Sequence, residues 1–143
     1  MTYMAKQAKN GFTLIEILIA VAIVLIMGAV VVPGFMGYMR RARLTSAKST
    51  IGTLETAINQ FNADTGKYPS NLKDLIKRPT SDEAVAKKWV SPYIKGNEVP
   101  ADPWGNRYQY TVTPGAEHAY ELYSFGPNGR GAPKIEWISV WDL

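Results

Sequence analysis

The chain has 143 residues, a formal net charge of +4 and no cysteine. This length allows one modest domain beside any membrane anchor, and the lack of cysteine excludes disulfides and thiol chemistry. The positive charge is too small and too scattered along the sequence to indicate a nucleic-acid-binding protein.

A long apolar segment begins close to the amino terminus. Between Leu14 and Phe35 the only charged residue is Glu16, and a helix of about 20 apolar residues can cross a bilayer. A lone carboxylate near the start of such a helix is costly in lipid, so we expect Glu16 to have a partner. The Gly11–Phe12 junction precedes the apolar run, which distinguishes the segment from an ordinary secretory signal.

The string Gly-Phe-Thr-Leu-Ile-Glu at residues 11–16, with Lys6 and Lys9 before it, resembles the amino terminus of type IV pilins and pseudopilins. The resemblance implies that a prepilin peptidase cleaves between Gly11 and Phe12 and methylates the new amine of Phe12. It also implies that Glu16 meets the amine of Phe12 in a neighbouring subunit during assembly. Such a pairing is physically reasonable, because an unpaired charge at low dielectric costs more than a paired one. The alternative is a plain transmembrane anchor whose Glu16 lies near the interface.

Basic residues flank the apolar segment on both sides. Those on its carboxyl-terminal side are Arg40, Arg41, Arg43 and Lys48. Read alone, the positive-inside rule would place the following domain in the cytoplasm. The resemblance implies the reverse, a cytoplasmic leader and a domain outside, and we follow it because the peptidase motif is more specific than a charge count. The basic cluster is then expected to reach lipid headgroups by snorkelling, or to pair with acids of adjacent subunits.

An amphipathic pattern continues beyond the apolar segment. Apolar residues recur at spacings of three and four, at Leu44, Ala47, Ile51, Leu54, Ile58 and Phe61. This stripe predicts a helix lying on a folded domain, and Gly66 is a plausible end signal. We therefore expect one helix from about Phe12 to about Ala63. The pattern lasts under three heptads, too short to favour a coiled coil.

Helix-breaking residues interrupt the apolar half at Gly28, Pro33, Gly34 and Gly37. Pro33 removes a backbone hydrogen bond and clashes with the preceding turn. Two interpretations stay open. One is a kink of the kind that membrane helices tolerate. The other, suggested by pilin-like filaments, is a segment that loosens when the subunit leaves the bilayer.

The rest of the chain predicts a small mixed domain. A short helical pattern is expected within Pro69–Arg78, with Ser70 or Asn71 as its N-cap, and a helical turn or a loop is expected at 80–88. The irregular stretch that follows supplies apolar side chains for the core, at Trp89, Val90, Tyr93 and Ile94.

Alternating apolar and polar residues predict three strands, at residues 108–112, 119–125 and 135–141. Antiparallel meandering pairing is the simplest topology, with one face of the sheet covering the helix stripe. The expected fold class is therefore α+β: a long N-terminal helix, membrane-spanning in its first half, packed on a small antiparallel β-sheet.

Four further strings narrow the resemblance. Residues 65–69 look like the Gly-x-Tyr-Pro corner of the family, 77–80 like its Lys-Pro-Thr element, and 124–129 like the start of its final loop. Residues 102–110, Asp-Pro-Trp-Gly-Asn-Arg-Tyr-Gln-Tyr, are close to the signature of major pseudopilins of type II secretion. We interpret this signature as structural, with a turn at Pro103 and Gly105 and Trp104 in the core.

The final loop, Gly126–Lys134, departs from the family pattern. The resemblance implies several aspartates here that bind calcium, but this loop has none and contains Arg130 and Lys134. Calcium requires roughly six to eight oxygen ligands, and Ser124, Asn128, Glu136 and backbone carbonyls would form a weak site at most. We expect no cofactor, with weak calcium binding as the alternative, and we expect apolar burial to hold the C-terminal segment, through Trp137, Ile138 and Trp141.

Enzymatic chemistry is not indicated. His118 is the only histidine, and the spacing of Glu117 and Glu121 gives no reason for them to converge on it as an acid–base pair. The glycines of Gly126–Gly131 lack the Gly-Lys-Ser/Thr ending of a phosphate-binding loop.

The resemblance implies a leader at 1–11, a transmembrane and filament-core segment at 12–38, and a globular domain at 39–143. It implies a single-pass protein of the bacterial inner membrane with its C-terminal domain in the periplasm. Its implied function is to polymerise with itself into a periplasmic pseudopilus for type II secretion across the outer membrane. The implied partners are minor pseudopilins, the prepilin peptidase and the inner-membrane secretion platform, with no nucleic acid.

The alternative function is a type IV pilin or a competence pseudopilin, acting in adhesion, motility or DNA uptake. Many type IV pilins close their C-terminal region with a disulfide, which this chain cannot form. DNA handling is expected to need a basic groove with aromatic side chains, and the sequence shows none.

Overall fold

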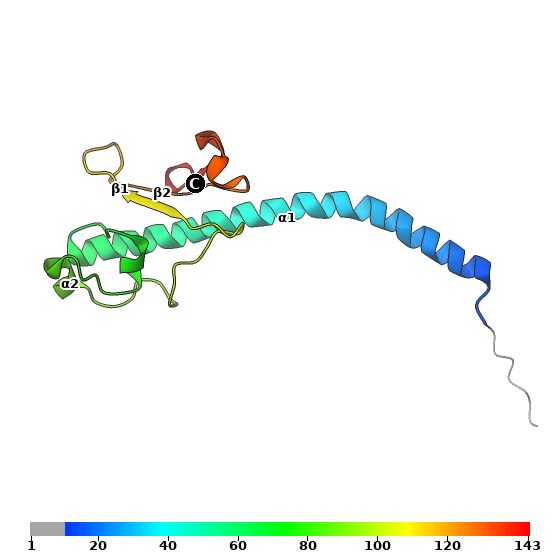
Figure 1. Ribbon diagram of the computed structural model, residues 1–143, viewed down its shortest axis with the longest axis horizontal. Helices are drawn as coiled ribbons and strands as arrows, with labels where there is room; N and C mark the ends of the chain where they lie inside the picture. The colour runs from blue at the N-terminus through cyan, green and yellow to red at the C-terminus, as the bar shows by residue number, and fades with distance from the viewer. Residues whose placement is uncertain (1–10) are drawn as a thin grey trace, which may run out of the picture. The chain divides into compact units, whose positions relative to one another are not determined.

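A computed structural model describes residues 11–143 of the chain. The first ten residues, including Lys6 and Lys9 of the expected leader, lie outside the described residues. The dominant element is helix α1, Leu14–Thr65, of 52 residues (Figure 1). Internal contacts divide the chain into two units between Arg40 and Arg41, so that α1 begins in the first unit and ends in the second. The helix thus extends from two residues after the predicted start to two residues past the predicted end.

The part of α1 in the first unit is apolar and exposed. Of the helices in residues 11–143, only α1 is long and apolar enough to cross a bilayer, by length and composition alone. No residue of its most apolar 18-residue window is buried. The helix continues through Pro33 without a break in its assigned structure.

The part of α1 in the second unit buries the predicted stripe. Ala47, Ile51, Leu54, Ile58 and Phe61 are buried, and Leu44 packs against them half-buried. The helix ends where Gly66 adopts a positive φ of 77° and its N–H donates to the carbonyl of Asn62 at 2.8 Å. The 3.6-residue period therefore predicted both the buried face and the end of this helix.

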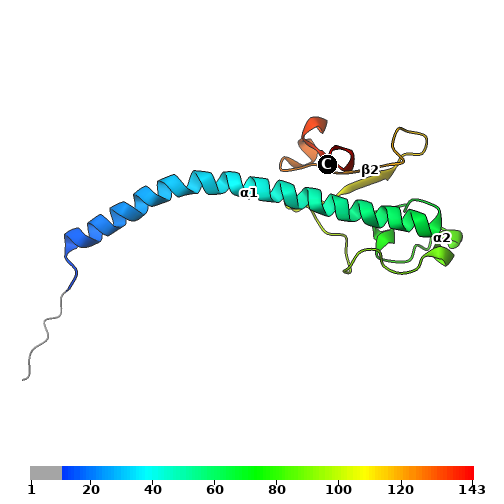
Figure 2. The ribbon, with the colours of Figure 1, turned by 180° about the vertical axis from the view of Figure 1, so that it is seen from behind.

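Two short helical elements follow, each with a polar cap. The 3-10 helix η1, Leu72–Leu75, is capped by Asn71, whose side chain accepts the Lys73 N–H at 2.9 Å. Helix α2, Glu83–Lys88 (Figure 2), has Asp82 as its N-cap, whose side chain accepts the N–H groups of Ala84 and Val85. The prediction of Asn71 as an N-cap is confirmed, and the helical alternative for residues 80–88 is the correct one.

Three strands form an antiparallel sheet in the predicted order β1-β2-β3. They are β1, Gln109–Val112, β2, Tyr120–Ser124, and β3, Ile138–Ser139. Tyr110 pairs with Leu122, and Ser124 pairs with Ile138. Together with α1 this sheet makes an α+β fold, as predicted.

The third strand is much shorter than the predicted span of Ile135–Trp141. Residues 134–136 form the 3-10 helix η3, and residues 140–142 form the 3-10 helix η4. The Trp137 N–H donates to the carbonyl of Lys134 at 3.2 Å, and the Trp141 N–H donates to the hydroxyl of Ser139 at 3.2 Å. Local acceptors therefore take backbone donors that a longer strand would have used in the sheet.

The core joins the α1 stripe to side chains from the sheet and from the two short helices. Tyr120 and Leu122 of β2 are its central sheet residues, and Leu75 and Val85 come from η1 and α2. Trp89, Tyr93 and Ile94 pack against it as predicted. The prediction is wrong for Val90, which is 72% exposed, because its neighbours are held instead: the Trp89 ring N–H donates to the carbonyl of Asp74 and the Tyr93 N–H to that of Leu75.

Candidate functional site

The start of α1 holds the residues for which an assembly role was predicted. The Thr13 N–H donates to Oε2 of Glu16 at 3.4 Å, and the Glu16 N–H donates to Oγ1 of Thr13 at 3.3 Å. This reciprocal pair is a capping box, which satisfies two N–H groups at a helix start. A carboxylate is also favoured there by the helix dipole. In the single chain, the partner of Glu16 is therefore its own helix end, a role that the Thr-x-x-Glu spacing could have predicted.

Gly11 and Phe12 precede this cap and are exposed. The Phe12 side chain is 80% exposed. A Cβ added to Gly11 would meet nothing within 4 Å, so the fold itself does not require a glycine at this position. A requirement for a small residue at Gly11 would therefore come from another molecule that recognises the Gly11–Phe12 peptide bond.

The surface of the first unit lacks any covering of its own. Large apolar side chains are exposed all along it, among them Ile15, Val24, Ile26, Val30 and Phe35. A helix that is apolar all round is stable only when lipid or other helices cover it. Glu16 is the only acidic residue before Glu55, so it is the one carboxylate that this apolar surface presents.

The basic cluster after the apolar part of α1 is exposed and has no acid beside it. Its residues are Arg40, Arg41, Arg43 and Lys48. The ion pairs formed within residues 11–143 are Lys67–Asp82 and Lys87–Glu83, and neither involves the cluster. Its charges are free for an external partner, and both predicted partners, lipid headgroups and acids of adjacent subunits, stay open.

A buried carboxylate organises the signature at residues 102–110. Asp102 is 4% exposed. Its Oδ1 accepts the N–H groups of Trp104 and Asn106 at 3.1 and 2.7 Å, and its Oδ2 accepts the Ser124 hydroxyl at 2.6 Å. The Ser124 oxygen in turn accepts the Gly126 N–H at 3.0 Å. The signature thus builds a turn and fastens it to the end of β2, which supports its structural interpretation.

The role of Asp102 was not predicted, although the turn at Pro103 and Gly105 was. Trp104, predicted to lie in the core, packs against it half-buried. An aspartate at the start of a turn often accepts the backbone N–H two residues further on, and that signal was available. The contact with Ser124 was not available from sequence, because it joins residues 22 positions apart.

Side chains considered as calcium ligands in the final loop make hydrogen bonds within the chain. The Ser124 hydroxyl donates to Oδ2 of Asp102 at 2.6 Å, and Nδ2 of Asn128 donates to Oε2 of Glu136 at 2.7 Å. Within residues 11–143, no three His, Cys, Asp or Glu side chains gather in a metal-binding arrangement. Calcium requires roughly six to eight oxygen ligands, and these contacts occupy the Ser124 hydroxyl and one oxygen of Glu136.

Aromatic contacts close the C-terminal segment instead of full apolar burial. Ile138 is buried, but Trp137 is only half-buried and Trp141 is 38% exposed, so the prediction of apolar burial is wrong for both tryptophans. The Trp137 ring stacks on Tyr123 with centroids 4.4 Å apart and an angle of 4°. Such a pair adds about 0.5–1.5 kcal/mol beyond its buried area. Trp141 stacks on His118 and donates its ring N–H to the carbonyl of Tyr120.

The histidine and the buried tyrosines serve packing. His118 lies against Trp141 at a centroid distance of 4.0 Å, and it has neither Glu117 nor Glu121 as a hydrogen-bond partner within the described chain. Burial raises the pKa of Tyr120 to about 12, so its hydroxyl stays protonated at neutral pH. These side chains form no acid–base constellation.

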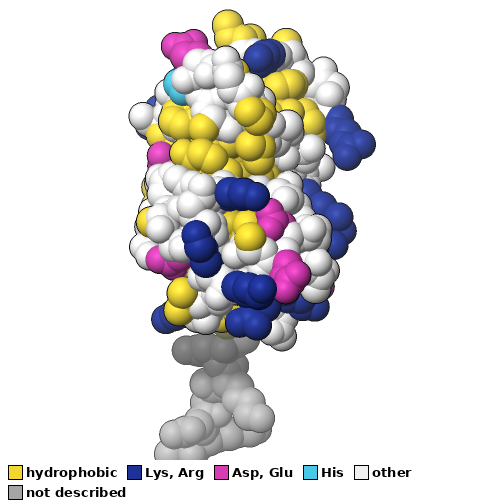
Figure 3. Space-filling view, turned by 90° about the vertical axis from the view of Figure 1, so that its left-hand side faces the viewer, with side chains coloured by type: hydrophobic (Ala, Val, Ile, Leu, Met, Phe, Trp, Pro, Cys, Tyr) yellow, Lys and Arg dark blue, Asp and Glu magenta, His cyan; other side chains and the backbone are white. Residues whose placement is uncertain are grey.

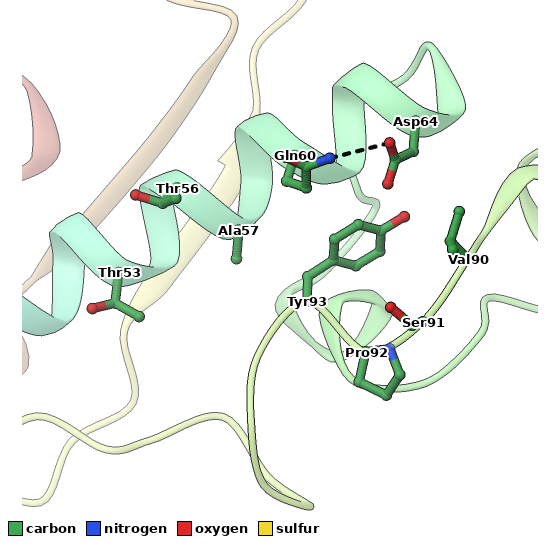
Figure 4. A pocket seen from close by; sticks show the side chains of 9 residues that line it. All are labelled: Thr53, Thr56, Ala57, Gln60, Asp64, Val90, Ser91, Pro92 and Tyr93. Carbon is green, nitrogen blue, oxygen red and sulfur yellow. Dashed lines mark hydrogen bonds between the residues drawn. The ribbon is translucent and has the colours of Figure 1, made fainter.

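An open groove runs between α1 and residues 90–93 (Figure 4). The Tyr93 ring lies across it with its hydroxyl toward Asp64 (Figure 4). Burial, helped by the Asp64 carboxylate, raises the pKa of Tyr93, although its hydroxyl makes no hydrogen bond within the described residues. Thr53 and Val90 complete the rim, so the groove offers a mixed surface without reactive groups.

An apolar hollow lies at the end of the second unit where α1 gives way to the Tyr68 corner. It is lined by Tyr68, Val112, Pro114, Ala116 and Ala119. Figure 3 shows this end of the molecule, where apolar side chains form a band with Lys and Arg side chains below it.

Comparison with known proteins agrees with these features. A family described as "Type II secretion system (T2SS), protein G" matches residues 34–138, and the prokaryotic N-terminal methylation motif matches residues 6–32. The chain is 38% identical to the type II secretion system core protein G of Pseudomonas aeruginosa, over 97% of this chain and 99% of the relative. It is also 38% identical to the core protein G of Escherichia coli, over 97% and 95%.

A solved structure shares the fold. It is the crystal structure of the major pseudopilin from the type 2 secretion system of enterohaemorrhagic Escherichia coli, with a TM-score of 0.57 and 27% identity. The similarity covers 76% of this chain and 94% of that one.

Proposed function

The chain belongs to the type II secretion system protein G family, and from this premise we propose how its amino-terminal residues assemble a filament. As a major pseudopilin it is a structural subunit of a pseudopilus. The relatives are structural proteins, and the apolar helix is consistent with membrane anchoring.

The first step of the proposal is processing. A prepilin peptidase cleaves between Gly11 and Phe12, removes the leader 1–11, and methylates the new amine of Phe12. The exposed position of both residues before the α1 cap supports this step, because the bond is accessible and is free of secondary structure. Residues 12–38 then act as the membrane-spanning and filament-core segment, and residues 39–143 act as the globular domain.

The second step is an exchange of partners by Glu16. In the single subunit its carboxylate accepts the Thr13 N–H at 3.4 Å, a long contact and therefore a weak one. In the filament the carboxylate pairs with the Phe12 amine of a neighbouring subunit, where low dielectric strengthens attraction between opposite charges. The observation that carries the proposal is that Glu16 is the only carboxylate in the exposed apolar part of α1 that belongs to the first unit.

The third step concerns orientation and partners. The subunit crosses the bacterial inner membrane once, with its C-terminal domain in the periplasm, and it polymerises with itself and with minor pseudopilins on the inner-membrane platform. The free basic cluster at residues 40–48 contacts lipid headgroups before assembly, because its side chains follow the apolar helix directly and have no acid beside them. Pairing with acids of adjacent subunits is the competing use of the same charges.

The experiment that tests the function is a comparison of filament yield between two variants of the cap. Glu16→Gln keeps a side-chain oxygen that can serve a capping box but removes the charge, whereas Thr13→Val removes the hydroxyl of the cap and keeps the charge. We expect Glu16→Gln to insert and to form few filaments, and Thr13→Val to form them. Abundant filaments from Glu16→Gln would contradict the pairing role.

A further inference from the structure

We propose that the final loop is closed by a latch of this chain's own side chains in place of a metal ion, so that the subunit folds without calcium. The latch consists of the Asn128–Glu136 hydrogen bond, the Trp137 ring with its contacts, and the Asp102–Ser124 bond at the base of the loop. A calcium ion closes a loop by drawing together oxygens from residues distant in sequence. In this chain each of those closures is made by a direct contact.

The first closure spans the loop itself. Nδ2 of Asn128 donates to Oε2 of Glu136 at 2.7 Å, across eight residues. A hydrogen bond with an ionised acceptor is about twice as strong as a neutral one. The Glu136 carboxylate, which is the only acid between Phe125 and Trp141, is thus committed to a neutral amide.

The second closure is aromatic. The Trp137 ring stacks on Tyr123 and meets the edge of Phe125 with centroids 5.3 Å apart. Its ring N–H donates to the carbonyl of Ala132 at 3.0 Å. A single side chain therefore connects the end of the loop, its middle, and the strand from which it departs.

The third closure holds the base. Ser124 pairs with Ile138 across β2 and β3, and its hydroxyl donates to the buried Asp102 while accepting the Gly126 N–H. A Cβ added to Gly126 would come within 3.2 Å of the carbonyl oxygen of Glu136. The two ends of the loop are therefore packed against each other at the base.

The charge of the loop opposes a divalent cation. Arg130 and Lys134 lie in the loop and are exposed, and they outnumber the single carboxylate of Glu136. Like charges repel an incoming cation, and the latch contacts occupy the Ser124 hydroxyl and one oxygen of Glu136. The contacts of the loop and its positive charge therefore both disfavour calcium binding.

The test measures thermal unfolding of the full chain in detergent micelles, followed by tryptophan fluorescence, in calcium and in a chelator. A bound ion raises the melting temperature with its free concentration, so the proposal expects the same melting temperature in both solutions. A fall of several degrees on chelation would overturn it.

A second variant converts the latch into a metal site. Asn128→Asp places a carboxylate against that of Glu136, so the variant is expected to melt about 5 °C below the parent in chelator and to recover in calcium. The double variant Asn128→Asp with Glu136→Gln is the matched control, and it is expected to lose the recovery. If Asn128→Asp melts like the parent in chelator, the Asn128–Glu136 contact does not close the loop, and the proposal fails.

Assembly gives a separate readout that rests on the proposed function. Filament yield of the parent is expected to be equal in calcium and in chelator. Filaments that disappear only in chelator would overturn the metal independence of assembly. If neither solution yields filaments while the melting temperatures agree, the proposed function fails and the latch stands.

Discussion

The two units of the chain differ in how their carboxylates are hydrogen-bonded and in how their apolar side chains are covered. In the second unit the buried carboxylate Asp102 has three hydrogen-bond donors, and the α1 stripe is covered by the sheet. In the first unit the apolar side chains of α1 are exposed, and within the described residues the Glu16 carboxylate accepts a single hydrogen bond, from the Thr13 N–H. The domain therefore covers its apolar side chains and pairs its buried carboxylate within a single chain. The apolar helix, by contrast, is covered only by lipid or by other copies of the chain.

The largest effect is expected from a substitution in the first unit that leaves the second unit intact. Glu16→Leu removes a costly charge from the apolar segment, so insertion into the membrane is expected to be unchanged or better. Filament yield is expected to fall to a small fraction of the parent's, because no carboxylate remains to pair with a Phe12 amine. Electron microscopy of sheared filaments, with immunoblots of membrane fractions as the control for insertion, checks both parts.

The next largest effect is expected from replacing the buried carboxylate of the second unit, which lowers the stability of that unit. Asp102→Ala leaves the N–H groups of Trp104 and Asn106 and the Ser124 hydroxyl without their acceptor, and hydrogen bonds to charged groups contribute about 1.5–3 kcal/mol each. We expect the free energy of unfolding to fall by about 3 kcal/mol or more. Chemical unfolding of the full chain in micelles measures it. Ser124→Ala is expected to lower the free energy of unfolding less, because it removes one of the three donors to Asp102. Equal losses in the two variants would contradict the role of Asp102 as the shared acceptor.

A smaller effect is expected at Trp137. Because the ring is half-buried, Trp137→Ala is expected to cost about 1.5–3 kcal/mol, less than the roughly 3–5 kcal/mol typical of a fully buried tryptophan. Trp137→Phe retains a ring against Tyr123 but loses the N–H bond to Ala132, and it should recover part of that loss. A loss in Trp137→Phe as large as in Trp137→Ala would assign the whole contribution to the hydrogen bond.

One glycine within α1 and one at the end of α1, Gly52 and Gly66, offer a matched pair of substitutions. Gly66 has a φ of 77°, whereas Gly52 lies within the helix with nothing within 4 Å of an added Cβ. Gly66→Ala is expected to destabilise by about 1 kcal/mol, and Gly52→Ala to stabilise by about 0.5–1 kcal/mol. Opposite shifts of the unfolding midpoint check this, and shifts of the same sign would contradict the assigned helix end.

The smallest effect depends on pH. The hydrogen bond from Lys67 is the main cause that lowers the pKa of Asp82 below its ordinary 3.8. A lowered pKa contributes stability that is present above the unfolded value and is lost as pH falls through the folded value. Asp82→Asn keeps a good N-cap for α2 and removes the charge. The stability difference between parent and variant is therefore expected to be small at neutral pH and to vanish below the folded pKa, as followed by unfolding midpoints across that range.

The sequence predicted most of the second unit because its local signals agree. The spacing from Leu44 to Phe61, Gly66 and the alternation at Tyr108–Val112 each report a local period or backbone need. The strand β3 is shorter than predicted because the carbonyls of Pro133 and Lys134 accept the N–H groups of Glu136 and Trp137, which residue alternation cannot reveal. The Asp102–Ser124 contact and the Tyr123–Trp137 stack depend on strand register, which brings together residues far apart in sequence.

For the amino-terminal site, the string at residues 11–16 supplied candidate residues whose assembly roles stay predictions. It was not used to predict the cap that Thr13 and Glu16 form in the single chain. The cap is a local motif, and its Thr-x-x-Glu spacing was readable. The pairing of Glu16 with another subunit is a property of the assembly, so it stays a prediction for a single chain.

The most direct measurement of the central claim is zero-length carbodiimide cross-linking of filaments assembled from a mixture of 14N- and 15N-labelled subunits. Such a reagent joins a carboxylate to an amine only where the two are in contact. If Glu16 pairs with a neighbouring subunit, mass spectrometry is expected to detect cross-linked peptides that join Phe12 of one isotope to Glu16 of the other, and these are expected to be absent in Glu16→Gln. Peptides cross-linked only within one isotope, or no product at Phe12 in abundant filaments, would contradict it.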